Sequence, residues 1–420
     1  MKEETVKSHR LPWQFSYLGL SCLIGWNVVL NVSETLKDKD VFTSDFGTHL
    51  STIYGLAMAL TILPLIFLPP DVMSRSFRSS IGGSLMFISL SLITASIFFK
   101  PASAAYGLVF VSILAVGTAL VQGFYFSEAA MHSKSAIGRF SLGQAISGLI
   151  CLPIKLGLDY ILPEAMYSAA AFVAIAAIAC AGSIPVYLFS VKVTLMDIEE
   201  DEGIDKSEKR SYSAIIADIW PMTLGIFLNF FFLFMVFPNH IPRWNATNKL
   251  FDPASYTFLT LAFFVYNVAD CLGRYLVRWV TLSRSGVMGA TTSRVLTLSL
   301  WYMATFFDVS FLTNDFVRLG VLVVHTAIQG LTVTWAFILA PSKITIAAEQ
   351  PVVGNMNTLA LVLGIMTGSA LAGPMDRLIY SEFSEGTLKT SSATAESAKG
   401  VGRDSTSLIP RRNLVLTPKN

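Results

Sequence analysis

The residues best suited to chemistry lie in the apolar segment FFVYNVADCLGRYLVRW, residues 263–279. Asn267, Asp270 and Arg274 are spaced by three and four, so a helix would present them on one face together with Phe263. Asp270 and Arg274 form an i, i+4 pair of opposite charge, with the carboxylate on the favourable N-terminal side. The pair could bind a polar solute, since Asp accepts and Arg donates hydrogen bonds in a water-poor cavity. Alternatively, it could be a buried ion pair that only fixes helix packing.

Other apolar segments contain similar polar groups. In LIGWNVVLN, Trp26 offers a flat surface on which many bases could stack, beside the polar Asn27. Gln122 precedes Gly123, and Gln144 lies in the small-residue run GQAISG, residues 143–148. An ordinary packed aromatic residue and amides bonded to neighbouring helices are the alternatives.

The elements that position these residues must be membrane spans. Of the 420 residues, 53% are hydrophobic and only 14% are charged, which is rare in soluble domains. An ionised side chain costs roughly 2.5 to 3.5 kcal/mol at the bilayer centre, so each one in a span needs a reason. The net charge of +2 gives no basic field that would gather nucleic acid, and we expect no nucleic-acid partner.

Hydropathy predicts eleven transmembrane helices, six before a charged segment and five after it. The cytoplasmic N-terminus covers 1–12, the first bundle 13–191, the cytoplasmic linker 192–213, the second bundle 214–380, and a disordered tail 381–420. The spans are expected near 13–31, 48–69, 80–99, 105–131, 138–160, 164–191, 214–238, 256–280, 288–311, 316–340 and 351–379.

The distribution of Lys and Arg predicts a cytoplasmic N-terminus, because positive residues near span ends are retained inside. Arg75, Arg78 and Lys134 are examples in loops that this orientation places inside. Eleven spans then put the C-terminus outside, although the tail contains several Lys and Arg residues. The sequons at Asn31 and Asn245 fall in predicted outer loops and are possible glycosylation sites.

The chain resembles the equilibrative nucleoside transporter family through motifs spread over most of its membrane portion. The most specific match is Asn267, Asp270, Leu272, Gly273 and Arg274 in the eighth span. The other matches are Trp26-Asn27, Gln122-Gly123, Gly143-Gln144, Phe237-Pro238, Gly330 with the following APSK (340–343), and VVGNMNTLALVLG (352–364). Gly25 replaces the usual Pro before Trp-Asn, the linker is short, and the tail is unusually long.

The resemblance implies a fold similar to the major facilitator class, with a six-span and a five-span bundle around a central cavity. It implies that Trp26, Gln122, Asp270 and Arg274 touch a nucleoside and that Asn267 lines the same cavity. We therefore expect facilitative transport of nucleosides, with nucleobases as a further candidate class of solute, by alternating access of the two bundles.

A proton-coupled symporter on the same scaffold is the alternative, and Asp270, Glu128, Asp308 and His325 are its titratable candidates. We also considered an intramembrane enzyme or a receptor, but the sequence has no HExxH motif or phosphate-binding loop, and its span count is far from seven. We expect no catalytic residues, metal or cofactor. The expected partners are the small-molecule solute and the lipid bilayer, with the chain a monomer in the plasma membrane.

Overall fold

The chain divides into two compact units, Met1–Ala372 and Gly373–Asn420. The computed structural model describes residues 12–43, 45–68, 72–101, 103–194, 210–237, 240–241, 244, 257–307, 311–344 and 346–399. Asn245, Asp308, Pro238 and most of the predicted linker lie outside these residues.

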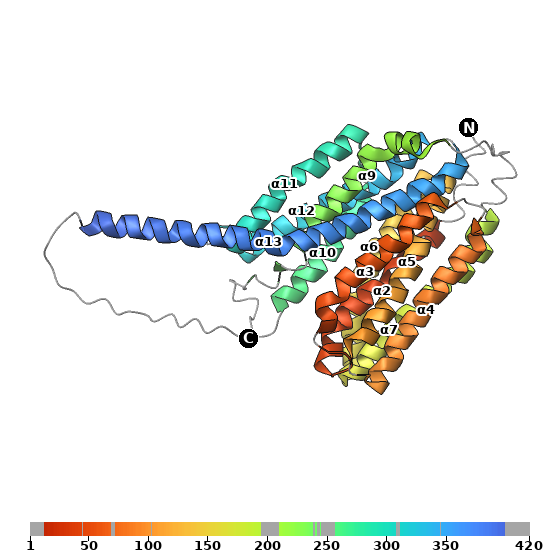
Figure 1. Ribbon diagram of the computed structural model, residues 1–420, viewed down its shortest axis with the longest axis horizontal. Helices are drawn as coiled ribbons and strands as arrows, with labels where there is room; N and C mark the ends of the chain where they lie inside the picture. The colour runs from red at the N-terminus through yellow and green to blue at the C-terminus, as the bar shows by residue number, and fades with distance from the viewer. Residues whose placement is uncertain are drawn as a thin grey trace. The chain divides into compact units, whose positions relative to one another are not determined.

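The described part of the chain is helical, without β-strands (Figure 1). The first bundle contains α2 (Pro12–Asp38), α3 (Asp45–Phe67), α4 (Arg75–Phe99), α5 (Ala104–His132), α6 (Lys134–Ile161) and α7 (Ala165–Val186), which continues into the π-helical turn Tyr187–Val191. The second contains α9 (Tyr212–Phe234), α10 (Thr257–Leu276), α11 (Arg284–Phe306), α12 (Asp315–Leu339) and the part of α13 (Gln350–Lys399) up to Ala372. Two short 3-10 turns, Pro341–Lys343 and Ala347–Glu349, precede α13.

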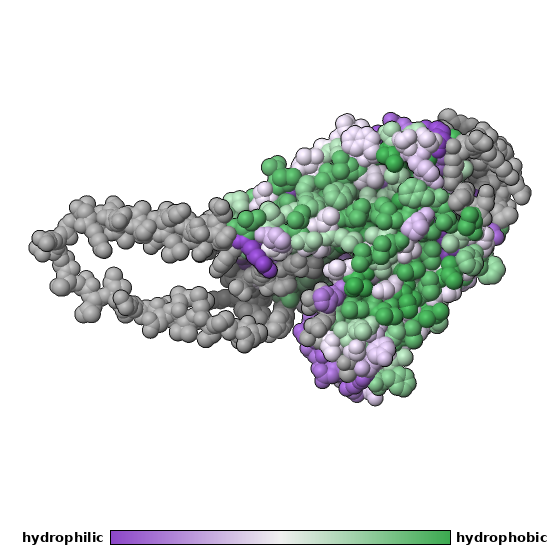
Figure 2. Space-filling view, in the orientation of Figure 1, coloured by the Kyte–Doolittle hydropathy of each residue, from purple (hydrophilic) through white to green (hydrophobic). Residues whose placement is uncertain are grey.

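Each of the eleven predicted spans coincides with one of these helices, which confirms the all-α arrangement of six helices and then five. Judged by length and composition within the described residues, nine of them could cross a membrane. The exceptions are α10, which contains Asp270 and Arg274 and whose preceding residues are not described, and α11, which contains Arg294 and many Ser and Thr residues. Figure 2 shows hydrophobic residues over the sides of the helices, as expected of an integral multi-pass membrane protein.

Short polar side chains fix where several helices begin. Before five of the described helices, the side chain of the preceding residue accepts a hydrogen bond from a backbone N–H of the first turn, which no residue within the helix can satisfy. These residues are Ser74 before α4, Ser133 before α6, Ser211 before α9, Ser283 before α11 and Asn314 before α12. Of the helices discussed below, α6 and α12 therefore have defined starting points.

Glycines allow two pairs of helices to approach backbone to backbone. A Cβ at Gly143 of α6 would collide with the Ser16 carbonyl of α2, and one at Gly19 of α2 would collide with the Phe140 carbonyl of α6. In the second bundle, a Cβ at Gly273 of α10 would collide with the carbonyl of Ala327 in α12. Small residues at such positions are typical of helix contacts in membranes. They hold α6 and α10 in fixed positions within their bundles.

Two boundaries differ most from the sequence prediction. Helix α2 continues to Asp38, so Asn31 lies within a helix rather than in a loop, with its amide donating to the Asn27 carbonyl at 2.7 Å. Helix α13 continues to Lys399, whereas disorder is predicted from residue 381. No proline occurs between Pro374 and Pro410, so nothing in this stretch forces the helix to end.

Candidate functional site

The predicted ion pair is present on α10. The Nε atom of Arg274 lies 3.2 and 3.1 Å from the two carboxylate oxygens of Asp270. Both residues are only 7% exposed. The pair is close-packed from the α12 side, because a Cβ at Gly330 would approach the Asp270 carboxylate to 3.0 Å. Each charge is thus compensated by the other in a site from which most water is excluded.

Arg274 also connects the two bundles. Its Nη1 donates to the carbonyl and the hydroxyl of Ser141 on α6, both at 3.0 Å. The Ser141 hydroxyl lies 2.9 Å from that of Thr334 on α12. Since Thr334 donates its single hydroxyl proton to the Gly330 carbonyl, Ser141 must be the donor to Thr334. One continuous hydrogen-bond chain therefore joins α10, α6 and α12.

The bundles also approach each other closely further along α6. Asn27 of α2 donates to the Ser147 hydroxyl at 2.8 Å. A Cβ at Gly148 would collide with the Asn267 amide oxygen of α10 and would lie 3.6 Å from the Asn27 amide nitrogen. Glycine at this position thus lets amides from two bundles approach the same point on α6. We call the connected groups the α6 seam: Asn27, Ser141, Ser147, Gly148, Asn267, Asp270, Arg274 and Thr334.

Trp26 lies beside the α6 seam but faces another helix. Its ring stacks on Tyr54 of α3, with centroids 4.0 Å apart and an interplanar angle of 24°. Tyr54 is 6% exposed, whereas Trp26 is half-buried. The indole is therefore held flat by an aromatic neighbour that the sequence did not predict.

Gln122 of α5 is fully buried, and neither atom of its amide has a hydrogen-bond partner among the described residues. The amide nitrogen of Gln144 on α6 is also buried and without a partner there. Burying an unpaired polar group typically costs about 1 to 3 kcal/mol, so such groups are expected to meet a ligand or water. No hydrogen bond or ring contact in the described part of the chain joins Gln122 to Trp26 or α10.

The bundles also meet at one end of the helices, where α5 and α12 finish. We call this the predicted cytoplasmic end, after the predicted orientation. Arg78 of α4 donates to the Asn355 amide oxygen of α13 at 2.7 Å, and Phe126 of α5 stacks on Phe337 of α12 at 3.9 Å. A Cβ at Gly354 of α13 would collide with the Gly123 carbonyl of α5. These contacts close the bundles against each other at this end.

Ser141 and Thr334 are the parts of the α6 seam that the sequence prediction missed. A signal was available for Ser141, which precedes Gln144 by three residues and Gly148 by seven and so shares their helix face. Thr334 follows Gly330 by four residues, but nothing in its own segment marks it as a neighbour of α6.

Comparison with known families and structures agrees with this fold. The family model described as nucleoside transporter matches residues 190–374, which confirms the predicted resemblance over the second bundle. Among curated proteins, none matches this chain significantly.

The solved structures that are similar include several transporters. A major facilitator superfamily transporter, FucP, in the outward conformation has 14% identity and a TM-score of 0.54, with 87% of this chain and 92% of that chain covered. The proton:xylose symporter XylE, bound to 6-bromo-6-deoxy-D-glucose, has 11% identity, a TM-score of 0.60 and 90% coverage of both chains. A bacterial homologue of the iron transporter ferroportin has 10% identity, a TM-score of 0.59, and coverage of 88% and 95%. At these identities the likeness shows the fold, which is that of major facilitator transporters.

Proposed function

We propose that this chain, a membrane protein with the fold of major facilitator transporters and a nucleoside transporter match in its second bundle, carries nucleosides and nucleobases by facilitative diffusion. The family match and the fold support membrane transport. The Asp270–Arg274 pair on α10 carries the more specific proposal, because it is buried and bonds across the bundle interface to Ser141 of α6. The N-terminus is cytoplasmic, the C-terminus extracellular and the membrane the plasma membrane in this proposal.

In the proposed mechanism, the solute replaces contacts that the protein makes with itself. A ribose or base offers hydroxyls, ring nitrogens and carbonyls, which match the accepting carboxylate of Asp270 and the donating guanidinium of Arg274. Trp26 stacks on the base, Gln122 pairs its unpartnered amide with the base edge, and Asn267 lines the cavity. A solute held by α2, α5 and α10 contacts both bundles, so binding favours the rocking step that moves the opening to the other side.

The surroundings of His325 favour facilitative diffusion over proton coupling at this residue. His325 is fully buried, and its Nε2 lies 2.7 Å from the guanidinium Nη2 of Arg294. Arginine only donates, so Nε2 must accept, and the ring proton is on Nδ1 facing the Thr297 hydroxyl at 2.7 Å. Thr297 in turn donates to the Arg294 carbonyl at 3.0 Å. Protonation of His325 would remove the acceptor and place two cations together.

The other described candidates for proton coupling are also engaged. Glu128 is buried, 3.5 Å from the Arg75 guanidinium, and accepts a hydrogen bond from Tyr187 at 3.1 Å. Asp270 is paired with Arg274. Asp308 lies outside the described residues. Both described carboxylate candidates thus have partners that favour the ionised form, which supports transport without proton coupling.

The proposal is tested by uptake of labelled nucleosides into proteoliposomes that contain Asp270→Asn, Arg274→Gln or Gln122→Leu. The first two variants should abolish saturable uptake while the protein still inserts into the membrane. Gln122→Leu should raise the solute concentration for half-maximal uptake about tenfold, because the amide contacts with the solute are lost. Asp159→Asn is the matched control, since Asp159 also pairs with a cation four residues away, Lys155, but is 44% exposed. Normal uptake by both α10 variants would refute the site, and accumulation driven by an imposed pH gradient would favour the symporter.

A further inference from the structure

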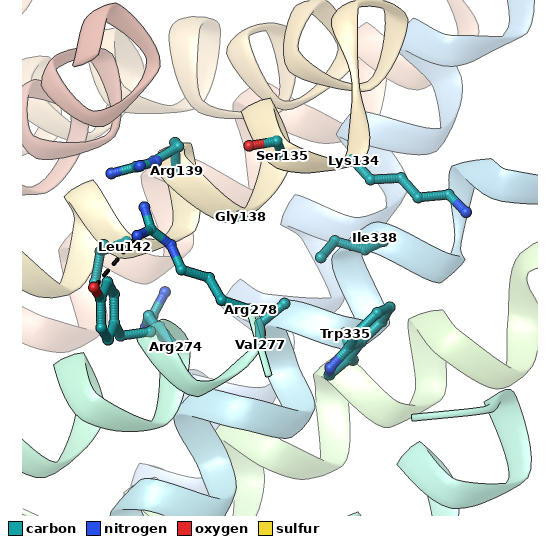
Figure 3. Close-up of a pocket in the computed structure, with 11 residues that line it drawn as sticks. Lys134, Ser135, Gly138, Arg139, Leu142, Arg274, Val277, Arg278, Trp335 and Ile338 are labelled. Atoms are coloured by element: carbon teal, nitrogen blue, oxygen red, sulfur yellow. Dashed lines mark hydrogen bonds between the residues drawn. The ribbon is translucent and has the colours of Figure 1, made fainter. Parts of the chain in front are cut away.

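A pocket separate from Trp26 and Gln122 lies at the predicted cytoplasmic end between the two bundles. Its volume is about 200 Å³. One wall is the beginning of α6, and the other is formed by the ends of α10 and α12 (Figure 3). The lining residues are Lys134, Ser135, Gly138, Arg139 and Leu142 from α6, Arg274 and Tyr275 from α10, Val277 and Arg278 from the turn that follows α10, and Trp335 and Ile338 from α12.

The lining includes four cations and no carboxylate. Figure 3 shows the guanidinium groups of Arg139, Arg278 and Arg274 on one side of the pocket, while Lys134 extends away from them. Arg274 is neutralised by Asp270. Arg278 has Tyr275 as its partner, with the guanidinium carbon 4.6 Å from the ring centroid and Nη1 3.3 Å from the hydroxyl. Tyr275 is uncharged, so no carboxylate of the described residues forms an ion pair with Arg278.

Arg139 and Arg278 lie close enough for their charges to repel each other. Neither Arg139 nor Lys134 has an ion-pair partner in the described part of the chain. Bringing two guanidinium groups together without a carboxylate is unfavourable unless an anion is shared between them. The contacts among the described residues therefore do not explain why Arg139 and Arg278 lie close together.

Two further features favour an anion here. The pocket lies at the N-terminus of the 28-residue helix α6, where the helix dipole attracts negative charge. The Ser135 hydroxyl adds a neutral donor at the same end. Trp335, by contrast, donates its indole N–H to the Val280 carbonyl at 2.7 Å, so its ring serves as an apolar wall.

We propose that this cationic pocket binds a phosphate group, held by the guanidinium forks of Arg139 and Arg278. A guanidinium donates two parallel hydrogen bonds to phosphate oxygens, which suits phosphate better than a small spherical anion. The phosphate belongs either to an anionic phospholipid of the adjacent leaflet or to a soluble phosphate compound. Because Arg139 is on the first bundle and Arg278 on the second, the bound anion stabilises the arrangement in which this end is closed.

The test measures thermal stability of the purified full chain in nanodiscs against added anion. One arm titrates inorganic phosphate and ATP with phosphatidylcholine alone, and the other replaces part of that lipid with phosphatidylserine or phosphatidylinositol in phosphate-free buffer. We expect a saturable rise in Tm in at least one arm, and the arm that responds identifies the source. No saturable rise in either arm would overturn the proposal.

Variants distinguish the pocket from general surface charge. Arg139→Gln and Arg278→Gln should each weaken the apparent anion affinity about tenfold, as expected for loss of a charge-assisted hydrogen-bond donor. Lys343→Gln removes one positive charge at the same end outside the pocket lining and should leave the affinity unchanged. Arg139→Lys keeps the charge but not the fork, and guards against an effect of misfolding. Equal affinity in the wild type and in both Gln variants would overturn the proposal.

Discussion

Replacing Asp270 with Asn is expected to leave Arg274 as a buried cation without its carboxylate. The two side chains are 10% and 6% exposed, so solvent can compensate little of the lost interaction. Removing one partner of a buried pair costs about 3 to 5 kcal/mol. We expect the lower end, about 3 kcal/mol, because the Asn amide oxygen still accepts a hydrogen bond and Ser141 still binds the guanidinium.

The assay is denaturant titration of purified protein in detergent micelles, with the free energy of unfolding taken from the midpoint and slope. Asp159→Asn is the control, because Asp159 is 44% exposed and an exposed pair contributes about 1 kcal/mol or less. The double variant Asp270→Asn/Arg274→Gln should be more stable than Asp270→Asn alone, since it leaves no unpaired charge. A loss in Asp270→Asn no larger than the control, or additive losses in the double variant, would refute the reasoning.

Three further predictions concern other contacts. Gly143→Ala should lower the free energy of unfolding by about 1 to 3 kcal/mol, because the new Cβ would push α6 away from α2. Gly157→Ala is the control and should leave the free energy of unfolding unchanged, since nothing lies within 4 Å of its new Cβ. Equal losses in the two variants would contradict this. Arg210 donates hydrogen bonds to Glu349, which lowers the pKa of that carboxyl below its usual value. The ionised Glu349 therefore adds to the free energy of unfolding at pH values above its unfolded pKa. This contribution is lost as the pH falls through the folded pKa. The difference in Tm between the wild type and Glu349→Gln should therefore shrink on acidification below pH 4.5, and a constant difference would contradict it. His325→Gln should lower Tm through loss of the Arg294 and Thr297 contacts but should not alter the response of uptake to a pH gradient, whereas a changed response would make His325 a coupling residue.

The eleven helices and the shared face of Asn267, Asp270 and Arg274 could be predicted because both follow from patterns within one segment. Hydropathy identifies a span, and the helical period places residues three and four apart on one side. The i, i+4 geometry even predicts the partner of Asp270 correctly.

Contacts between segments could not be predicted in this way. Nothing near Trp26 indicates that Tyr54 stacks on it, and the sequence does not show that Arg274 bonds to Ser141, 133 positions away. These partners depend on which helices pack together and in which register. The lack of a partner for Gln122 is likewise a property of the assembled bundle, since a single glutamine in a span gives no sign of what its amide meets. The substrate roles of Trp26, Gln122, Asn267, Asp270 and Arg274 remain predictions.

The most direct test of the account is uptake of labelled adenosine, inosine, uridine and hypoxanthine by proteoliposomes containing the purified chain, with and without a pH gradient. We expect saturable uptake that stops at equal concentrations on both sides, that unlabelled nucleoside competes away and that the gradient does not change, with the solute recovered intact. Absence of uptake for every solute, in vesicles shown to contain folded protein, would contradict the account.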